Sequence, residues 1–301
     1  MIRPRDHSSL KWRTDSGLSD LSGVSRASIR FSEVTMNKTR RTALSILLLI
    51  AVTGCGTGQK TPPANANTQK AEQPKKYGYE VVNTYAHDPT AFTQGLQLVN
   101  GFLYESTGLA GHSTVRKVDL KTGKVLQKSD LGPRYFGEGL TILNNKIYQL
   151  TWTTKIGFVY DIDTFKEVGQ FHYDWEGWGM TNDGVNLIIS DGSNSLRFVD
   201  PERFNVVRTI EVYRQGRPLT ELNELEYING EIYSNIWHED VIARINPADG
   251  KLLGLIDLSG LTKGMSLDNE DVLNGIAFDR ASNCLLVTGK RWPKLFQIRL
   301  K

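Results

Sequence analysis

From residue 78 onward, the hydrophobic and polar positions of the chain follow a pattern that occurs five times. Each repeat has a short apolar run, then a turn of Asn, Gly or Asp, and then a stretch in which apolar and polar residues alternate. Alternation with a period of two is typical of a β-strand, and two such runs around a short turn predict a β-hairpin. The five segments are residues 92–104, 136–148, 177–189, 222–233 and 273–286.

A second hairpin follows each of the first four segments, and equivalent positions of successive repeats lie 40 to 51 residues apart. Four strands in such a period predict the blade of a β-propeller. The fifth repeat stops one strand short after residues 295–300, and an alternating run at residues 79–85 supplies a further strand. We therefore expect an all-β fold, a five-bladed β-propeller over residues 78–301, with the ring closed by an N-terminal strand.

The part of the chain before the repeats predicts an export signal and a flexible linker. The apolar run 43–52 is too short to span a bilayer of about 30 Å. It follows Lys38, Arg40 and Arg41 and ends at Cys55, which is the order of a bacterial lipoprotein signal. We interpret residues 36–55 as that signal, with Cys55 as the lipid-attachment site; a buried helix that happens to precede a cysteine is the alternative.

Met36 suits a start codon, because Asp15, Asp20 and Glu33 fit poorly in a positively charged leader. We therefore expect residues 1–35 to be an upstream extension that is not part of the native protein. Residues 56–77 are polar, rich in Thr, Pro, Asn, Gln and Lys, and predict a flexible linker. The protein is then exported and anchored by lipid to a bacterial cell membrane, with its domain on the periplasmic or extracellular face.

Charge and metal-binding residues exclude several classes of protein. The chain has a formal charge of +3, of which residues 1–77 contribute +8 and residues 78–301 contribute −5. The repeat region therefore lacks the concentrated basic face that nucleic acids require. Two cysteines, Cys55 and Cys284, and five histidines without HxH or HxxxH spacing form no local zinc motif. We expect a monomer without nucleic-acid partners, and a buried, inert thiol at Cys284.

The repeats also place polar and aromatic residues at matching positions. The innermost strand of a propeller blade surrounds the axis, so the start of each first hairpin should face a common mouth. These positions hold Phe92, Gln94, Phe136, Glu138, Trp178, Asn223, Glu224 and Asn274. A second ring follows 14 to 18 residues later, at Trp152, Trp237, Lys290 and Trp292. Carboxylates, amides, one lysine and indoles suit a small polar group held between aromatic walls.

The motifs FTQGL, FGEGLTIL, GWGMTNDG, LNELEYINGEIYSNIW and LNGIAF, with the ending Lys290-Arg-Trp292, resemble the glutamine cyclotransferase family. The resemblance covers about residues 78–301. It implies a five-bladed propeller enzyme that cyclises the N-terminal Gln of peptides or proteins to pyroglutamate and releases ammonia. It also implies the active-site positions Phe92, Gln94, Phe136, Glu138, Trp152, Trp178, Asn223, Trp237 and Lys290.

This reaction needs a group that takes a proton from the attacking amine and returns it to the leaving nitrogen. We expect Glu138 to be that general acid/base, with its pKa raised beside Trp152 and Trp178. Asn223 and Lys290, with Gln94, are expected to donate N–H groups to the developing oxyanion. The other aromatic residues are expected to bind substrate.

Each of these residues also has a structural interpretation. Glu138 would accept backbone N–H groups at a strand end, Lys290 would be solvated, the amides would satisfy buried backbone, and the tryptophans would pack between blades. A non-catalytic propeller lipoprotein that binds peptides or sugars is the alternative function. No catalytic cofactor is expected, whereas Glu224 and Asp271 are candidates for a structural calcium site.

Overall fold

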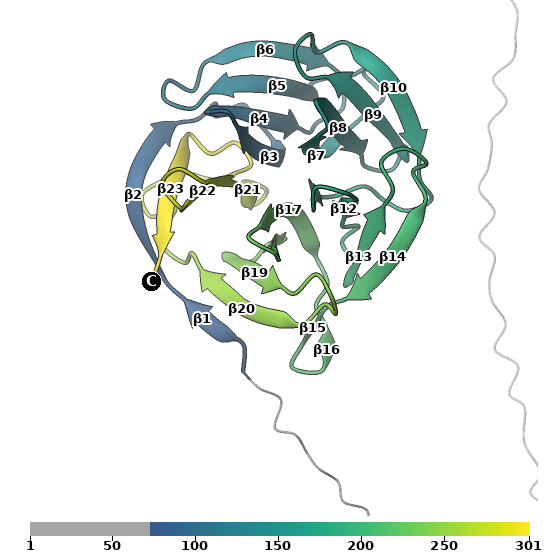
Figure 1. Cartoon of the computed structure of the whole chain (residues 1–301). Helices are drawn as coiled ribbons and strands as arrows, with labels where there is room; N and C mark the ends of the chain where they lie inside the picture. Colours follow the sequence, from purple (N-terminus) through teal and green to yellow (C-terminus); the bar gives the residue numbers. More distant parts are fainter. Residues whose placement is uncertain (1–72) are drawn as a thin grey trace, which may run out of the picture. The chain divides into compact units, whose positions relative to one another are not determined.

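The computed structural model describes residues 73–301. This part of the chain is built from strands and contains no helix. Five sheets are arranged around a common axis (Figure 1). Within the described residues there is, accordingly, no helix with the length and hydrophobicity to cross a lipid bilayer.

Each sheet is one blade, and four blades are continuous in sequence. The first has β3 (Thr93–Val99), β4 (Phe102–Thr107), β5 (Thr114–Asp119) and β6 (Val125–Asp130). The second has β7 (Gly137–Leu143), β8 (Lys146–Thr151), β9 (Ile156–Asp161) and β10 (Glu167–His172). The third has β11 (Met180–Asn182), β12 (Leu187–Ile189), β13 (Ser195–Val199) and β14 (Val206–Glu211). The fourth has β17 (Leu222–Ile228), β18 (Glu231–Ile236), β19 (Val241–Ile245) and β20 (Leu252–Asp257).

The fifth blade combines the two ends of the described chain. It has β21 (Leu273–Asp279), β22 (Cys284–Gly289) and β23 (Lys294–Leu300). Its outer strand is β2 (Tyr79–Ala86), which pairs antiparallel with β23 from Tyr79 opposite Leu300 to Ala86 opposite Lys294. The strand predicted over residues 79–85 is therefore present as β2, at the edge of this sheet (Figure 1).

Two short elements lie outside this scheme. The strand β1 (Lys75–Tyr77) pairs parallel with β20. The Tyr77 ring lies 4.5 Å from the guanidinium carbon of Arg244. Strand pairing thus begins three residues before the predicted domain start, because Tyr77 makes a cation–π contact with Arg244 and packs against buried apolar residues. The hairpin of β15 (Tyr213–Arg214) and β16 (Arg217–Pro218) connects the third and fourth blades.

The first hairpin of several blades turns as the Asn-rich sequence predicts. Asn100 and Gly101 both have positive φ, as do Asn144 and Asn145 and, in the fourth blade, Asn229 and Gly230. Two consecutive residues in the left-handed region match the twist of the flanking strands, and Asn and Gly tolerate that conformation best. The turns therefore set the spacing of the strands that face the axis.

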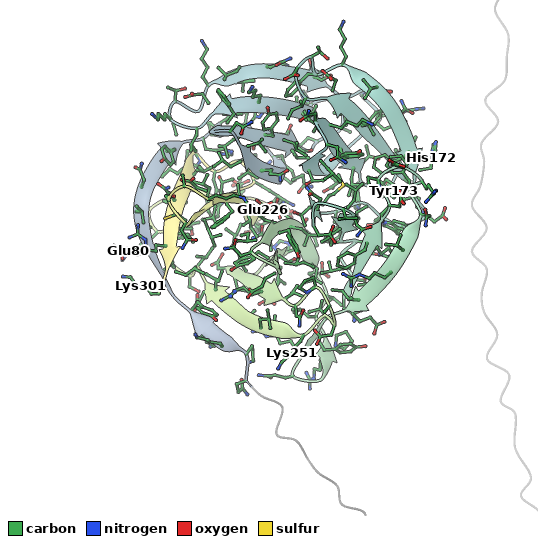
Figure 2. The ribbon with its side chains drawn as sticks, in the orientation of Figure 1. Glu80, His172, Tyr173, Glu226, Lys251 and Lys301 are labelled. Atoms are coloured by element: carbon green, nitrogen blue, oxygen red, sulfur yellow. The ribbon has the colours of Figure 1, made fainter. Side chains whose placement is uncertain are left out.

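The innermost strands contact one another in a ring: β3 with β7, β7 with β11, β11 with β17, β17 with β21, and β21 with β3. Glycines of the repeated motif allow this approach. A Cβ on Gly139 would overlap the backbone of Met180, and one on Gly179 would overlap that of Asn223. Figure 2 shows Glu226 near the centre of the ring, whereas Glu80 and Lys301 lie at its outer rim. The all-β, five-bladed propeller predicted from the repeats is confirmed.

The extension predicted at 1–35, the signal at 36–55 with Cys55, and the linker up to residue 72 all lie outside the described residues. Cys284 is a buried free thiol, as expected.

Candidate active site

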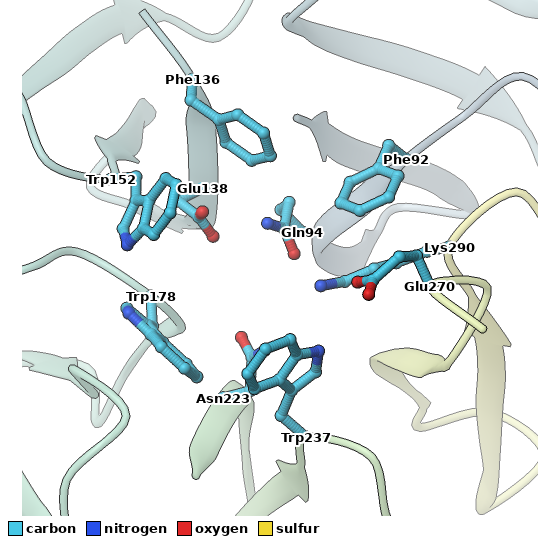
Figure 3. Close-up of a pocket in the computed structure, with 10 residues that line it drawn as sticks. All are labelled: Phe92, Gln94, Phe136, Glu138, Trp152, Trp178, Asn223, Trp237, Glu270 and Lys290. Carbon is cyan, nitrogen blue, oxygen red and sulfur yellow. The ribbon is translucent and has the colours of Figure 1, made fainter. Parts of the chain in front are cut away.

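A cavity of about 300 Å³ opens among the residues that begin the innermost strands and follow the second strands. Its lining is drawn in Figure 3 and consists of Phe92, Gln94, Phe136, Glu138, Trp152, Trp178, Asn223, Trp237, Glu270 and Lys290. The structure therefore brings together all nine residues that the resemblance placed in the active site. Glu270 is an addition.

Equivalent backbone positions explain why residues far apart in sequence meet here. Gln94, Glu138 and Asn223 are each the second residue of an innermost strand. Trp152 donates its backbone N–H to the carbonyl oxygen of Phe136 at 3.0 Å, and Lys290 makes the same kind of closing bond to its own blade. The closing bond joins residues 16 apart, and Glu138 lies two residues after Phe136, which accounts for the 14-residue offset between Glu138 and Trp152.

Glu138 is held by a chain of amides from neighbouring blades. The carboxylate is only 5% exposed and accepts a hydrogen bond from the side chain of Gln94. Asn274 Nδ2 donates to Gln94 Oε1 at 3.0 Å and to the carbonyl oxygen of Thr93 at 2.9 Å. Because Asn274 occupies the oxygen of Gln94, the amide nitrogen of Gln94 turns toward Glu138 (Figure 3).

Burial dominates the electrostatics of Glu138 and Lys290. It raises the pKa of Glu138 well above the ordinary value, and the negative charge of Glu176 adds to this. The Lys290 cation and the Gln94 hydrogen bond act in the opposite direction without cancelling it. Burial also lowers the pKa of Lys290, against the attraction of Glu138. A carboxyl whose pKa is raised by burial is suited both to take and to return a proton.

Aromatic rings surround these polar groups. Phe136 meets Phe92 edge-on with ring centroids 6.0 Å apart, and it meets Trp152 in the same way at 5.8 Å. On another side, Trp178 and Trp237 are perpendicular, at 89°, with centroids 5.7 Å apart. Edge-to-face contacts are favourable and leave ring faces free for a substrate.

Two polar atoms at the cavity have no hydrogen-bond partner within the described residues. These are Asn223 Oδ1 and Trp237 Nε1, both of which are shielded from solvent. The oxygen of Asn223 points into the pocket in Figure 3. An unsatisfied buried polar atom costs about 1–3 kcal/mol. A ligand that donates to Asn223 and accepts from Trp237 would remove this cost, although Asn223 had been expected to donate.

Glu224, which shares β17 with Asn223, has the structural role that the sequence left open for it. Its two oxygens accept the backbone N–H groups of Leu96 at 3.1 Å and Ile276 at 2.8 Å, on the first and fifth blades. Asp271 instead pairs with Arg291. In residues 73–301, no group of three or more His, Cys, Asp or Glu side chains could hold a metal ion. The calcium site suggested for Glu224 and Asp271 stays a prediction.

Trp292, the last member of the predicted second ring, does not line the cavity. It is 1% exposed, packs in the core of the fifth blade, and donates from Nε1 to the carbonyl oxygen of Asp271 at 2.7 Å. Two acidic residues near the cavity were not predicted. Glu176 directly precedes the repeated segment that starts at Gly177, and Glu270 lies in the connection between β20 and β21, which is longer than the other connections between blades.

Fold and site together define a five-bladed β-propeller with a buried carboxyl of raised pKa in an aromatic pocket. Residues 48–300 match the sequence model of the glutamine cyclotransferase family, and the chain belongs to this family. It is 50% identical over 227 residues to a glutaminyl-peptide cyclotransferase of Arabidopsis thaliana, a match that covers 74% of this chain and 71% of that protein.

A solved structure is also similar. The glutaminyl cyclase of Myxococcus xanthus superposes with a TM-score of 0.72 and 37% sequence identity, over 76% of this chain and 99% of that one. The prediction of an enzyme of the glutamine cyclotransferase family with a five-bladed propeller fold is confirmed by these matches.

Proposed function

We propose that this chain converts the N-terminal Gln of peptides or proteins to pyroglutamate with release of ammonia, and that Glu138 is its general acid/base. The observation that carries the proposal is the buried Glu138 carboxyl, which faces a cavity walled by aromatic rings and has its pKa raised by burial. Family membership and the names of both relatives support the same reaction.

The chemistry needs no nucleophile from the enzyme. The α-amine nitrogen of the substrate attacks the carbon of its own γ-carboxamide, and a C–N bond forms. The Glu138 carboxylate takes the proton that the amine loses and then delivers it to the amide nitrogen. The original C–N bond breaks, and ammonia leaves. Positioned acid–base help of this kind contributes about 10²–10⁴-fold to the rate.

The remaining polar groups have two roles: some donate to the oxyanion, and one accepts a hydrogen bond from the substrate amine. The Lys290 ammonium nitrogen lies 4.8 Å from the centroid of Phe92 and 5.9 Å from that of Trp237, in the lining of the cavity. Lys290 and the unpartnered Trp237 Nε1 are donors for the oxyanion that forms on the carboxamide oxygen. Asn223 Oδ1 accepts an N–H of the substrate amine and so directs its lone pair toward the carbon.

Ammonia release from a Gln-initiated dipeptide tests the proposal on the purified full chain. The expected result is turnover of the free dipeptide, none of its N-acetylated form, and no loss of activity after dialysis against a chelator. A folded chain without turnover would overturn the enzymatic proposal in favour of the peptide- or sugar-binding protein. Loss of activity on chelation, restored by added metal, would overturn metal independence.

We also propose that the chain is exported and anchored through a lipid on Cys55, on the strength of the sequence pattern alone. Expression in a bacterial host with a labelled fatty acid should give a labelled, membrane-bound protein. The variant Cys55→Ser should be unlabelled and released from the membrane. Equal labelling of both proteins would overturn the proposal. Gel filtration of the purified chain tests the expected monomer.

A further inference from the structure

One carboxylate joins two of the indoles in the cavity wall. Glu176 lies between β10 and β11, and its Oε2 accepts a hydrogen bond from Trp152 Nε1 at 2.7 Å and from Trp178 Nε1 at 3.2 Å. Trp152 follows β8 in the second blade, whereas Trp178 directly precedes the third. In Figure 3 the nitrogen atoms of these two indoles face each other across a gap.

Packing alone does not hold Trp152 in this orientation. Its side chain is 41% exposed, and its described ring contact is a single edge contact with Phe136. An exposed indole with a single aromatic ring contact has little packing to select one of its side-chain rotamers. The short hydrogen bond to Glu176 fixes which edge of the ring faces the cavity, and bonds to a charged acceptor are about twice as strong as neutral ones.

Trp178 in turn contacts a third indole of the cavity wall. Its ring stands perpendicular to that of Trp237, so any rotation of Trp178 would move the surface against which Trp237 rests. The indole N–H of Trp237 has no hydrogen-bond partner within the described residues. A single oxygen of Glu176 therefore sets the relative placement of Trp152 and Trp178, and Trp178 in turn contacts Trp237.

We propose that Glu176 is a positioning residue, whose carboxylate locks Trp152 and Trp178 as a pair and thereby shapes the wall that holds the N-terminal Gln of the substrate. This role rests on the proposed function. The wall contacts the substrate both before and during the reaction, so the lock contributes to binding rather than to the proton transfer itself. Its loss should therefore appear in KM.

The steady-state test compares Glu176→Ala and Glu176→Gln with the native chain on a Gln-initiated dipeptide. Glu176→Ala should raise KM about tenfold or more and change kcat less than about threefold, because two charge-assisted hydrogen bonds are lost. Glu176→Gln keeps an amide oxygen that can accept both indole N–H groups, so its KM should lie between that of the native chain and that of Glu176→Ala. The matched control is Glu167→Ala, at an exposed position of β10 in the neighbouring blade, and it should leave KM unchanged.

The indole N–H signals in a proton–nitrogen NMR spectrum give a readout that does not depend on turnover. Signals assigned through Trp152→Phe and Trp178→Phe should move together in Glu176→Ala and stay in place in Glu167→Ala. An unchanged KM in a folded Glu176→Ala protein, a fall in kcat alone, or unmoved indole signals would each overturn the proposal. If the native chain shows no turnover, the proposed function fails, while the indole signals still decide whether Glu176 holds the wall.

Discussion

Two glutamates on adjacent blades are almost equally buried, yet they have opposite electrostatic properties. Glu105 on β4 is 1% exposed and Glu138 on β7 is 5% exposed. Arg116 donates to Glu105 from Nε at 2.9 Å and forms an ion pair from Nη2 at 2.7 Å. Thr93 and His87 add hydrogen bonds at 2.7 and 3.1 Å. These partners hold the pKa of Glu105 far below its usual value despite the opposing effect of burial.

Glu138 has one amide partner and a lysine that makes no ion pair with it within the described residues, and burial raises its pKa. The comparison shows that burial alone does not identify a catalytic carboxyl. A buried carboxylate with a full set of cationic and hydrogen-bonding partners stays ionised and stabilises the fold. A buried carboxyl with few partners beside a cavity can gain and lose a proton.

The largest expected effect is the loss of activity when Glu138 is substituted. Glu138→Gln removes the proton acceptor and keeps the shape of the side chain, so kcat should fall about 10²–10⁴-fold. Its stability at neutral pH should not fall, because a raised pKa means that folding disfavours the ionised form that the substitution eliminates. Ammonia release and urea unfolding measure the two quantities. Retained activity would remove Glu138 from the acid/base role.

The reverse outcome is expected at Glu105. Glu105→Gln removes the anion that pairs with both buried Arg116 and His87, and it leaves Arg116 with Asp88 alone at 2.8 Å. Breaking a buried pair costs about 3–5 kcal/mol. The free energy of unfolding should fall by this amount while kcat/KM of the folded protein stays near the native value. A large loss of kcat/KM in a folded variant would contradict the distinction between the two glutamates.

The same pairs make stability depend on pH in two directions. The folded pKa of Glu105 is lowered, so its contribution is complete above the unfolded value of about 4.3 and is lost as the pH falls below it. The folded pKa of His87 is raised, because Glu105 outweighs the opposing burial. Its contribution is complete below about 6.5 and is lost as the pH rises through the folded pKa. Glu105→Gln should abolish both dependences in unfolding curves.

A smaller effect is expected at Glu224, which combines a raised pKa with two backbone hydrogen bonds. Glu224→Gln replaces one acceptor oxygen with an N–H group that faces another N–H. The free energy of unfolding should therefore fall by about 1–3 kcal/mol. If kcat falls in parallel with that of Glu138→Gln, a raised pKa rather than the cavity would mark the catalytic group.

The smallest expected effect is a shift in the pH profile of kcat/KM, which reports the pKa of Glu138. In the native protein, kcat/KM should rise as the pH passes through the raised pKa of Glu138, because the reaction begins with the carboxylate. Lys290→Gln removes a cation that lowers this pKa, so the acid limb should move to higher pH. Glu176→Gln removes a negative charge that raises it, so the limb should move to lower pH. Shifts in the same direction for both variants would contradict the assignment of the limb to Glu138.

The sequence predicts the blades well, because turns that contain Asn, Asp or Gly and alternating strands are local signals that recur along the chain. It also predicts the cavity lining, since one hairpin length separates Glu138 from Trp152 and Asn223 from Trp237. It misses Glu270, because the connection between β20 and β21 is longer than the other connections between blades. The raised pKa of Glu138 is predicted from its aromatic neighbours, whereas the role of Glu224 depends on partners from blades distant in sequence, which no local pattern records.

The pairing of β2 with β23 has a consequence for how the protein folds. Along the chain, β2 comes before the first blade and β23 comes after the first four blades. Four blades can therefore form before β2 has its partner, and until then β2 keeps an open hydrogen-bonding edge that other chains could join. A chain truncated before residue 294 should therefore aggregate more readily on refolding than the whole chain, which light scattering measures.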